Sequence, residues 1–146
     1  MSERQYADAF AAEPKLAADP NTWHRYDAAC SAALAAGQSE DARLLPDKAV
    51  CMFRHWALGW LRADLTTYAR LAGQTNPAVT QAIQERLAHW RRDPDLASVR
   101  YPQTIDRLPE NERAAWRALW RDVDELAKKA EPTQWRKEPE TPKAKP

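Results

Sequence analysis

Few residues in this chain have the types and spacing that chemistry needs, and Cys51 and His55 are the first of them. They stand four positions apart, so a helix would present both as metal ligands on one face. A tetrahedral zinc site needs further ligands, and no Cys-x-x-Cys motif or second histidine pair supplies them. We therefore expect these residues to pack against their neighbours, and we expect no metal and no cofactor.

Two other side chains have the chemical character for catalysis. A reactive thiolate at Cys30 would need a basic partner, and His24, six positions earlier, falls on a different face of the same helix. Asp64 would need a second placed group for acid–base work, and no carboxylate shares a clear site with it. We expect Cys30 to fill a close contact between helices and Asp64 to pair with a basic group, such as an arginine, across two helices. The sequence therefore predicts a protein that is not an enzyme.

Tryptophan–arginine pairs recur along the chain, and interleaved aromatic and basic groups can bind single-stranded nucleic acid. The pairs are Trp90-Arg91, Trp116-Arg117, Trp120-Arg121 and Trp135-Arg136. Neighbouring side chains on a helix point about 100° apart, so the tryptophans can be buried while the arginines stay in solvent. The formal net charge of +1 favours this second interpretation, and nucleic-acid binding is kept only as an alternative.

The elements that position these residues are helices, because alanine is abundant and only three glycines interrupt the chain. Helices are expected over about residues 3–12, 21–36 and 47–71, from Asn76-Pro77 to Trp90, and from near Pro109 to Ala130. Their packing stripes are expected at Leu58, Leu61, Leu65, Tyr68 and Ala72, flanked by Phe53, Ala57 and Trp60; at Val79, Ile83, Leu87 and Trp90; and at Trp116, Leu119, Trp120, Val123, Leu126 and Ala130. Residues 93–108 are expected to form an extended or one-turn connector that Leu96, Val99 and Ile105 anchor. His89 is expected on the surface, beside its stripe.

The second of these segments carries the most specific packing signal. Tyr26, Ala29, Cys30 and Ala33 share one helical face, and their small side chains would let another helix approach closely. Gly37 follows and suits the left-handed conformation just past a helix end. At the start of the next segment, Pro46 suits the first helical position.

The ends of the chain lack signals for a membrane. The N-terminus begins with polar residues rather than a signal peptide, and no run of about 18 apolar residues occurs. We therefore expect no membrane association and a cytoplasmic location. Residues 132–146 are rich in proline and lysine and are expected to form a disordered tail, after a single α-helical domain over residues 1–131.

The first helices resemble tetratricopeptide (TPR) repeats. The residues that carry the resemblance are Tyr6, Ala9, Phe10 and Pro14 in one repeat, and Tyr26, Ala29, Cys30, Ala33, Gly37 and Ala42 in the next. About six extra residues, 15–20, separate the two repeats, and Pro46 stands where the second helix should continue. The resemblance implies an all-α fold of antiparallel helical hairpins of TPR-like solenoid type, with a TPR-like part over residues 1–45 and a Trp-rich capping block over 46–131.

Three later blocks, residues 56–65, 89–100 and 108–120, are similar to the C-terminal end of TPR regions in large bacterial multidomain proteins. Many of those proteins join a serine/threonine kinase domain to the repeats. This chain has no glycine-rich phosphate loop, no His-Arg-Asp triplet and no Asp-Phe-Gly triplet. A link to kinase signalling would therefore come through association with a kinase.

The resemblance also implies a binding surface. If the TPR register applies, the concave groove would be lined by His24, Asp27 and Ser31, with Leu34 and Ala35 one turn further on. Such grooves hold an extended or helical segment of a partner protein, which implies a non-catalytic interaction adaptor. The structural alternative is a truncated capping fragment of a kinase–TPR polypeptide. The identity of the partner and the oligomeric state are left open.

Overall fold

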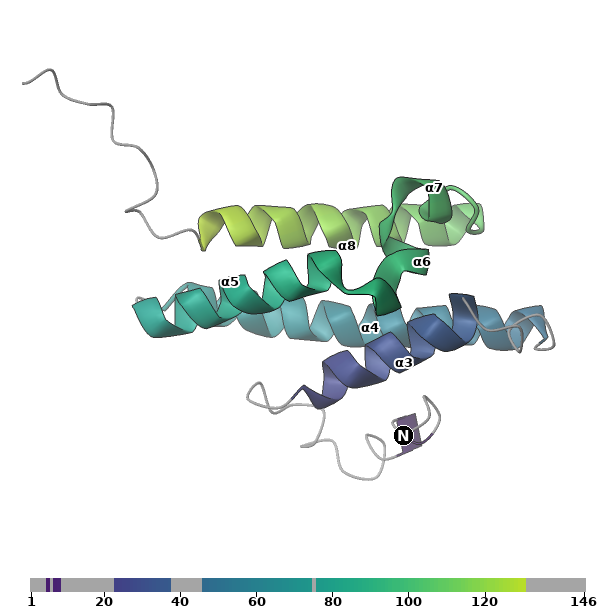
Figure 1. The fold of residues 1–146 in the computed structure, drawn as a ribbon, viewed down its shortest axis with the longest axis horizontal. Coiled ribbons are helices and arrows are strands. Elements are labelled where there is room, and N and C mark those ends of the chain that lie inside the picture. Colours follow the sequence, from purple (N-terminus) through teal and green to yellow (C-terminus); the bar gives the residue numbers. More distant parts are fainter. Residues whose placement is uncertain (1–4, 6, 9–22, 38–45, 75, 131–146) are drawn as a thin grey trace, which may run out of the picture.

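The computed structural model describes residues 5, 7, 8, 23–37, 46–74 and 76–130, and the elements that it describes are all helices. The long helices are α3 (His24–Gly37), α4 (Asp47–Ala72), α5 (Pro77–Arg92) and α8 (Glu110–Lys129). The 3₁₀ turn η2 (Pro94–Leu96) and two short helices, α6 (Ala97–Arg100) and α7 (Pro102–Ile105), join α5 to α8 (Figure 1). The all-α prediction is confirmed. The helix expected at residues 3–12 and the tail at 132–146 lie mostly or wholly outside the described residues.

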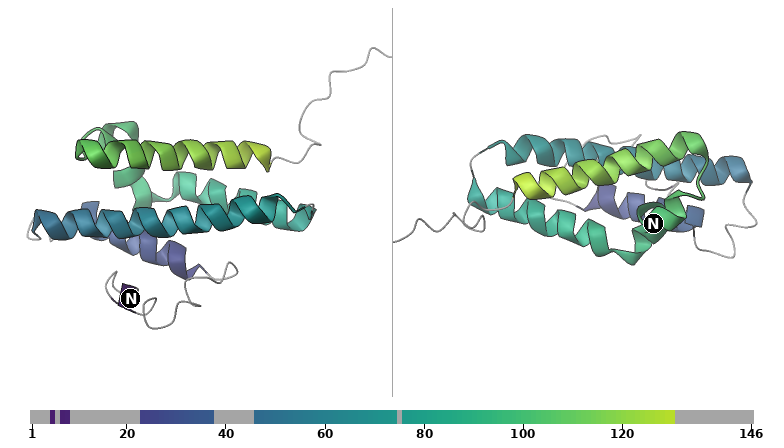
Figure 2. Two further views of the ribbon diagram at one scale, coloured as in Figure 1. Left: turned by 180° about the vertical axis from the view of Figure 1, so that it is seen from behind. Right: turned by 90° about the horizontal axis from the view of Figure 1, so that it is seen from above.

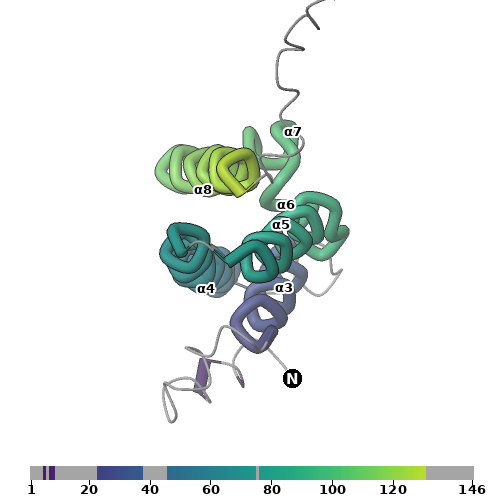
Figure 3. Tube along the Cα trace, turned by 90° about the vertical axis from the view of Figure 1, so that its left-hand side faces the viewer, coloured from purple at the N-terminus to yellow at the C-terminus, as the bar shows by residue number. Residues whose placement is uncertain are grey.

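The long helices form three layers. Viewed end-on, α4 and α5 lie side by side in the middle, with α8 on one side of them and α3 on the other (Figure 3). Successive long helices run antiparallel, so α4 and α8 share one direction (Figure 2). Of these contacts, the one between α3 and α4 is the most extensive, as the row of small residues on α3 predicts.

Two helix starts show how proline and its neighbours set the boundaries. The side chain of Asn76 accepts a hydrogen bond from the backbone N–H of Ala78 at 3.1 Å, and Pro77 occupies the first turn of α5, as the sequence predicts. At α4, Pro46 was expected at the first helical position. It is instead the capping residue, and the helix begins one residue later, at Asp47. Pro46 has an extended ψ of 142°, which keeps it outside the helix.

The predicted stripes meet in one core. Trp90 and Trp116 are among its largest fully buried side chains, and the three anchors of the connector, Leu96, Val99 and Ile105, are buried with them. The connector itself is folded into short helical turns, which corresponds to the one-turn alternative. Five of the predicted stripe residues pack against the core while only partly buried: Leu58, Trp60, Ala72, Val79 and Trp120.

The expectation for Gly37 is wrong. Gly37 is the last residue of α3, and no described glycine has a positive φ. The reason for a glycine is a close approach of two helices, because a Cβ added at Gly37 would lie 2.5 Å from the Cβ of Ser98 in α6. Gly37 therefore lets the end of α3 contact α6 directly.

Helix length and hydropathy bear on membrane insertion. Within the described residues, no helix combines the length and the apolar character that crossing a bilayer requires.

Candidate functional site

A groove of about 770 Å³ lies between α3 and α5, and we call it the α3–α5 groove. The side of α3 contributes Trp23, Tyr26, Asp27, Cys30, Ser31 and Leu34, while α5 and the turn after it contribute Ala82, Glu85, Arg86, His89, Asp93 and Asp95. The backbones of α3 and α5 seldom approach each other closely, because α3 packs mainly on α4.

The structure brings three of the five predicted binding residues into this groove. Asp27, Ser31 and Leu34 line it, and they lie at successive turns of α3. His24 and Ala35 lie on the same helix but do not line the groove. The α3 wall of the groove therefore coincides with most of the surface that the TPR register implies.

No pattern in the sequence pointed to the residues of the opposite wall. Glu85, Arg86 and His89 come from α5, roughly sixty residues after the α3 wall, and Asp93 follows at the end of that helix. His89 was expected on the surface, and its side chain is 44% exposed, but it also forms part of the groove wall. His89 and Asp93 are four positions apart, and this spacing is the one feature of the sequence that indicates their contact.

The carboxylate of Asp93 is the structural centre of the groove floor. One oxygen, Oδ2, accepts a hydrogen bond from the Tyr26 hydroxyl at 2.6 Å and lies 3.1 Å from Nε2 of His89. The other, Oδ1, accepts the backbone N–H of Asp95 at 2.9 Å. Burial acts to raise the pKa of Asp93, but the hydrogen bonds from Tyr26 and the Asp95 amide outweigh it and hold the pKa below its usual value.

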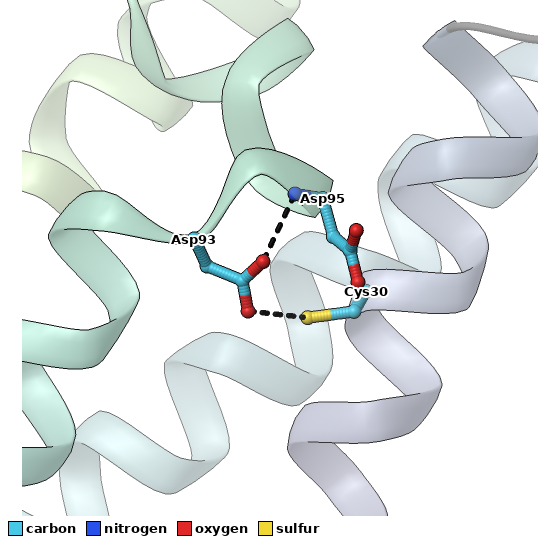
Figure 4. Close-up of side chains that lie close together, drawn as sticks. All are labelled: Cys30, Asp93 and Asp95. Carbon is cyan, nitrogen blue, oxygen red and sulfur yellow. Dashed lines mark hydrogen bonds between the residues drawn. The ribbon is translucent and has the colours of Figure 1, made fainter.

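Cys30 also faces this carboxylate. Its thiol donates to Oδ2 of Asp93 at 3.8 Å, and Cys30, Asp93 and Asp95 form a compact group (Figure 4). Burial, together with the nearby Asp93 charge, raises the pKa of the Cys30 thiol despite an opposing hydrogen bond from Tyr26. A metal would require the thiolate, and the oxygens of Asp93 already accept hydrogen bonds. The arrangement therefore suits a protonated, structural cysteine better than a nucleophile or a ligand.

Aromatic rings form the rest of the groove wall. Trp23 meets Tyr26 edge to face at a centroid distance of 5.3 Å and meets the His89 ring at 5.6 Å. The guanidinium of Arg86 lies 4.6 Å from the centroid of Trp23. Behind this wall, Tyr26 stacks on the buried Trp90 with an interplanar angle of 13°. The rings are thus held in place by contacts from two helices.

Asp64 pairs with an arginine of another helix, as the sequence predicts. Nη1 of Arg25 in α3 lies 2.9 Å from Oδ1 of Asp64 in α4, and both side chains are largely buried. Burial raises the pKa of Asp64 to about 6, although the charges of Arg25 and Arg86 act to lower it. This ion pair lies outside the groove lining and joins α3 to α4.

The tryptophan–arginine pairs separate into core and surface. Trp90 and Trp116 are buried, and the indole of Trp120 donates to the carbonyl oxygen of Val99 at 2.7 Å. The arginines that follow them pair with acidic groups: Arg91 with Asp124, Arg117 with Asp106 and Arg121 with Asp122. In these three pairs the tryptophans pack inward, as expected, and Trp135-Arg136 lies outside the described residues.

Cys51 and His55 are exposed on α4. They line a smaller pocket of about 330 Å³ with Arg54 of the same helix and Glu112 of α8. Among the described residues, no third ligand of the kind a metal needs gathers with this pair. Nη2 of Arg54 donates instead to Sγ of Cys51 at 3.4 Å.

The lining of the α3–α5 groove combines buried and exposed titratable groups. Its buried titratable groups, Tyr26, Cys30 and Asp93, are engaged with one another, while Asp27 and Glu85 are exposed along its edges. Compared with known proteins, the chain matches no family model, and neither curated proteins nor solved structures show significant similarity to it.

Proposed function

We propose that this protein is a non-catalytic interaction adaptor that binds a segment of a partner protein in the α3–α5 groove. The observation that carries the proposal is the groove itself, whose volume of about 770 Å³ falls within the range of about 300–1,000 Å³ for ligand pockets. Its wall combines exposed aromatic surface at Trp23 with polar groups at Asp27 and Ser31. Such a mixture suits a peptide, which offers both side chains and backbone hydrogen bonds.

The proposal includes a TPR-like architecture and a cytoplasmic role beside bacterial serine/threonine kinases. The antiparallel pair of α3 and α4 supports the first part, because it has the hairpin form of one repeat (Figure 2). The association with kinases is supported by the resemblance of three blocks to the C-terminal end of TPR regions in bacterial multidomain proteins. These blocks are residues 56–65, 89–100 and 108–120.

A selection from a display library of random twelve-residue peptides on the immobilised full chain tests this function. The affinities of the selected peptides are then measured for groove and control variants. Ser31→Tyr places a large ring in the groove, and we expect at least tenfold weaker binding. Thr66→Tyr makes the matched change at an exposed position on α4, in a separate pocket between α4 and α8, and should change affinity less than twofold. Circular dichroism checks that both variants fold.

His24→Ala and Asp27→Ala separate this groove from the surface that the TPR register alone implies. Asp27 lines the groove and His24 does not, so we expect only Asp27→Ala to weaken binding. If the library yields no peptide that binds, or if Ser31→Tyr leaves binding intact, the α3–α5 groove is not a peptide site. A purely structural capping role would then replace the adaptor.

A further inference from the structure

We infer that the group recognised in the α3–α5 groove is a cationic side chain, foremost an arginine, of a basic partner segment. This inference rests on the proposed function and adds the charge class of the ligand. Its first support is the charge balance of the lining. Four carboxylates, those of Asp27, Glu85, Asp93 and Asp95, line the groove with one guanidinium, that of Arg86.

The carboxylates differ in how many hydrogen bonds and ion pairs they already form within the protein. Asp93 is engaged with Tyr26, His89 and the Asp95 amide. In the described part of the chain, by contrast, no hydrogen bond or ion pair involves the carboxylates of Asp27 and Asp95. Burial and the neighbouring Asp93 charge raise the pKa of Asp95, and a cation placed in the groove would relieve this repulsion.

The one guanidinium of the lining, that of Arg86, is itself engaged with groups of the protein. It lies over the Trp23 ring and donates to the hydroxyl of Tyr68 at 3.1 Å. Its charge also acts on the buried Asp64, where it opposes the rise in pKa that burial causes. The lining as a whole therefore carries more carboxylates than guanidiniums, which favours a cationic ligand.

The aromatic wall favours a guanidinium over a compact ammonium. Arg86 already lies over the Trp23 ring, but 38% of Trp23 remains exposed, and the His89 ring beside it is partly exposed as well. A planar guanidinium can stack on aromatic faces and donate to carboxylates at the same time, whereas an ammonium is a more strongly hydrated point charge. An acidic segment would be repelled by Asp27 and Glu85.

The first test is the composition of the selected peptides. We expect arginine to be enriched over its library frequency and aspartate and glutamate to be depleted. A set of binding peptides that lack basic residues would overturn this inference while leaving the peptide-binding function in place. A selection that yields no peptide would overturn both.

The second test uses the tightest selected peptide and a copy in which each arginine is replaced by citrulline, which removes the charge but keeps the shape. We expect calorimetry to show at least tenfold weaker binding of the citrulline copy. A copy in which lysine replaces each arginine should have an intermediate affinity. Glu85→Gln and Asp27→Asn should each weaken binding of the arginine peptide by three- to tenfold. They should have much less effect on binding of the citrulline copy.

Matched variants outside the groove control for the overall charge. Glu110→Gln in α8 and Asp47→Asn in α4 make the same changes at exposed positions outside the groove and should alter affinity less than twofold. Binding should also weaken as salt rises, since ions screen exposed charges. The inference is wrong if the citrulline copy binds within twofold of the arginine peptide, or if the groove variants act no more strongly than these controls.

Discussion

The hydroxyl of Tyr26 in α3 donates a hydrogen bond of 2.6 Å to the carboxylate of Asp93, which lies 67 positions later at the end of α5. This contact joins two helices that also meet through the stacked rings of Tyr26 and Trp90. Burial, with the Asp93 hydrogen bond, raises the pKa of Tyr26, so the phenol remains a donor throughout the neutral range. The pair holds the floor of the α3–α5 groove.

Replacing Tyr26 by phenylalanine should therefore destabilise the fold. The change removes one donor to a buried carboxylate, and hydrogen bonds to charged groups contribute about 1.5–3 kcal/mol. We expect the free energy of unfolding in urea to fall by a comparable amount. Tyr101→Phe is the matched control, because Tyr101 is 50% exposed, and it should change stability by less than about 0.5 kcal/mol. Equal effects of the two variants would show that the Tyr26 hydrogen bond contributes little.

Gly37→Ala should be destabilising even though alanine favours helices. A methyl group at Gly37 would lie 2.5 Å from the Cβ of Ser98, and overpacking of this kind costs about 1–3 kcal/mol. Gly59→Ala is the control, since nothing lies within 4 Å of a Cβ there, and it should stabilise the protein by about 0.5–1 kcal/mol. Adding Ser98→Gly to Gly37→Ala should recover most of the loss in thermal denaturation. A Gly37→Ala variant as stable as Gly59→Ala would contradict the close contact.

Asp64 should make stability depend on pH in a defined direction. Its pKa is raised from 3.8 to about 6 in the folded protein, so between these values the folded state binds more protons than the unfolded state. Its contribution to stability is therefore fully present below about pH 4 and is lost as the pH rises through 6. One pKa unit corresponds to about 1.36 kcal/mol, so the loss is at most about 3 kcal/mol.

The comparison with Asp64→Asn isolates this effect, because other titrating groups are common to both proteins. We expect the stability of the wild type relative to Asp64→Asn to fall between pH 4.5 and pH 7.5 in chemical denaturation. A relative stability that rises with pH would mean that the ion pair with Arg25 outweighs burial, and that the pKa of Asp64 is lowered.

Two ion pairs between α4 and α8 should differ in strength. Glu112 receives two hydrogen bonds from Arg54, at 2.8 and 2.9 Å, and both side chains are largely buried. Arg62 and Asp122 make a single, more exposed pair. We expect Glu112→Gln to lower the free energy of unfolding by about 1–3 kcal/mol, against less than about 1 kcal/mol for Asp122→Asn. If the two variants proved equally stable, the paired geometry at Glu112 would contribute nothing beyond a surface contact.

The two free cysteines should react at different rates. Cys51 is exposed, whereas Cys30 is buried and its pKa is raised, mainly by burial. With an excess of Ellman's reagent on the native protein, we expect one fast thiol and a second that reacts only after unfolding. Cys51→Ser should abolish the fast phase. Two thiols of equal rate would show that the floor of the groove opens readily.

The sequence predicted the helices and the core well because both depend on local pattern. The capping of α5 by Asn76 and Pro77 follows from backbone chemistry within one turn, and the burial of Trp90 and Trp116 follows from the helical period. Gly37 shows the limit of this reasoning. A glycine at a helix end serves equally as a left-handed cap or as a point of close approach, and only Ser98, 61 positions away, distinguishes them.

The same division runs through the α3–α5 groove. The sequence by itself determined an all-α chain. Its resemblance to TPR repeats also implied Asp27, Ser31 and Leu34, which the structure places along the α3 wall of the groove. Only the tertiary structure decided that Glu85 and His89 form the other wall. Their meeting depends on how α3 and α5 are each packed against α4. Such packing is set by side chains between helices and leaves no periodic pattern in the sequence.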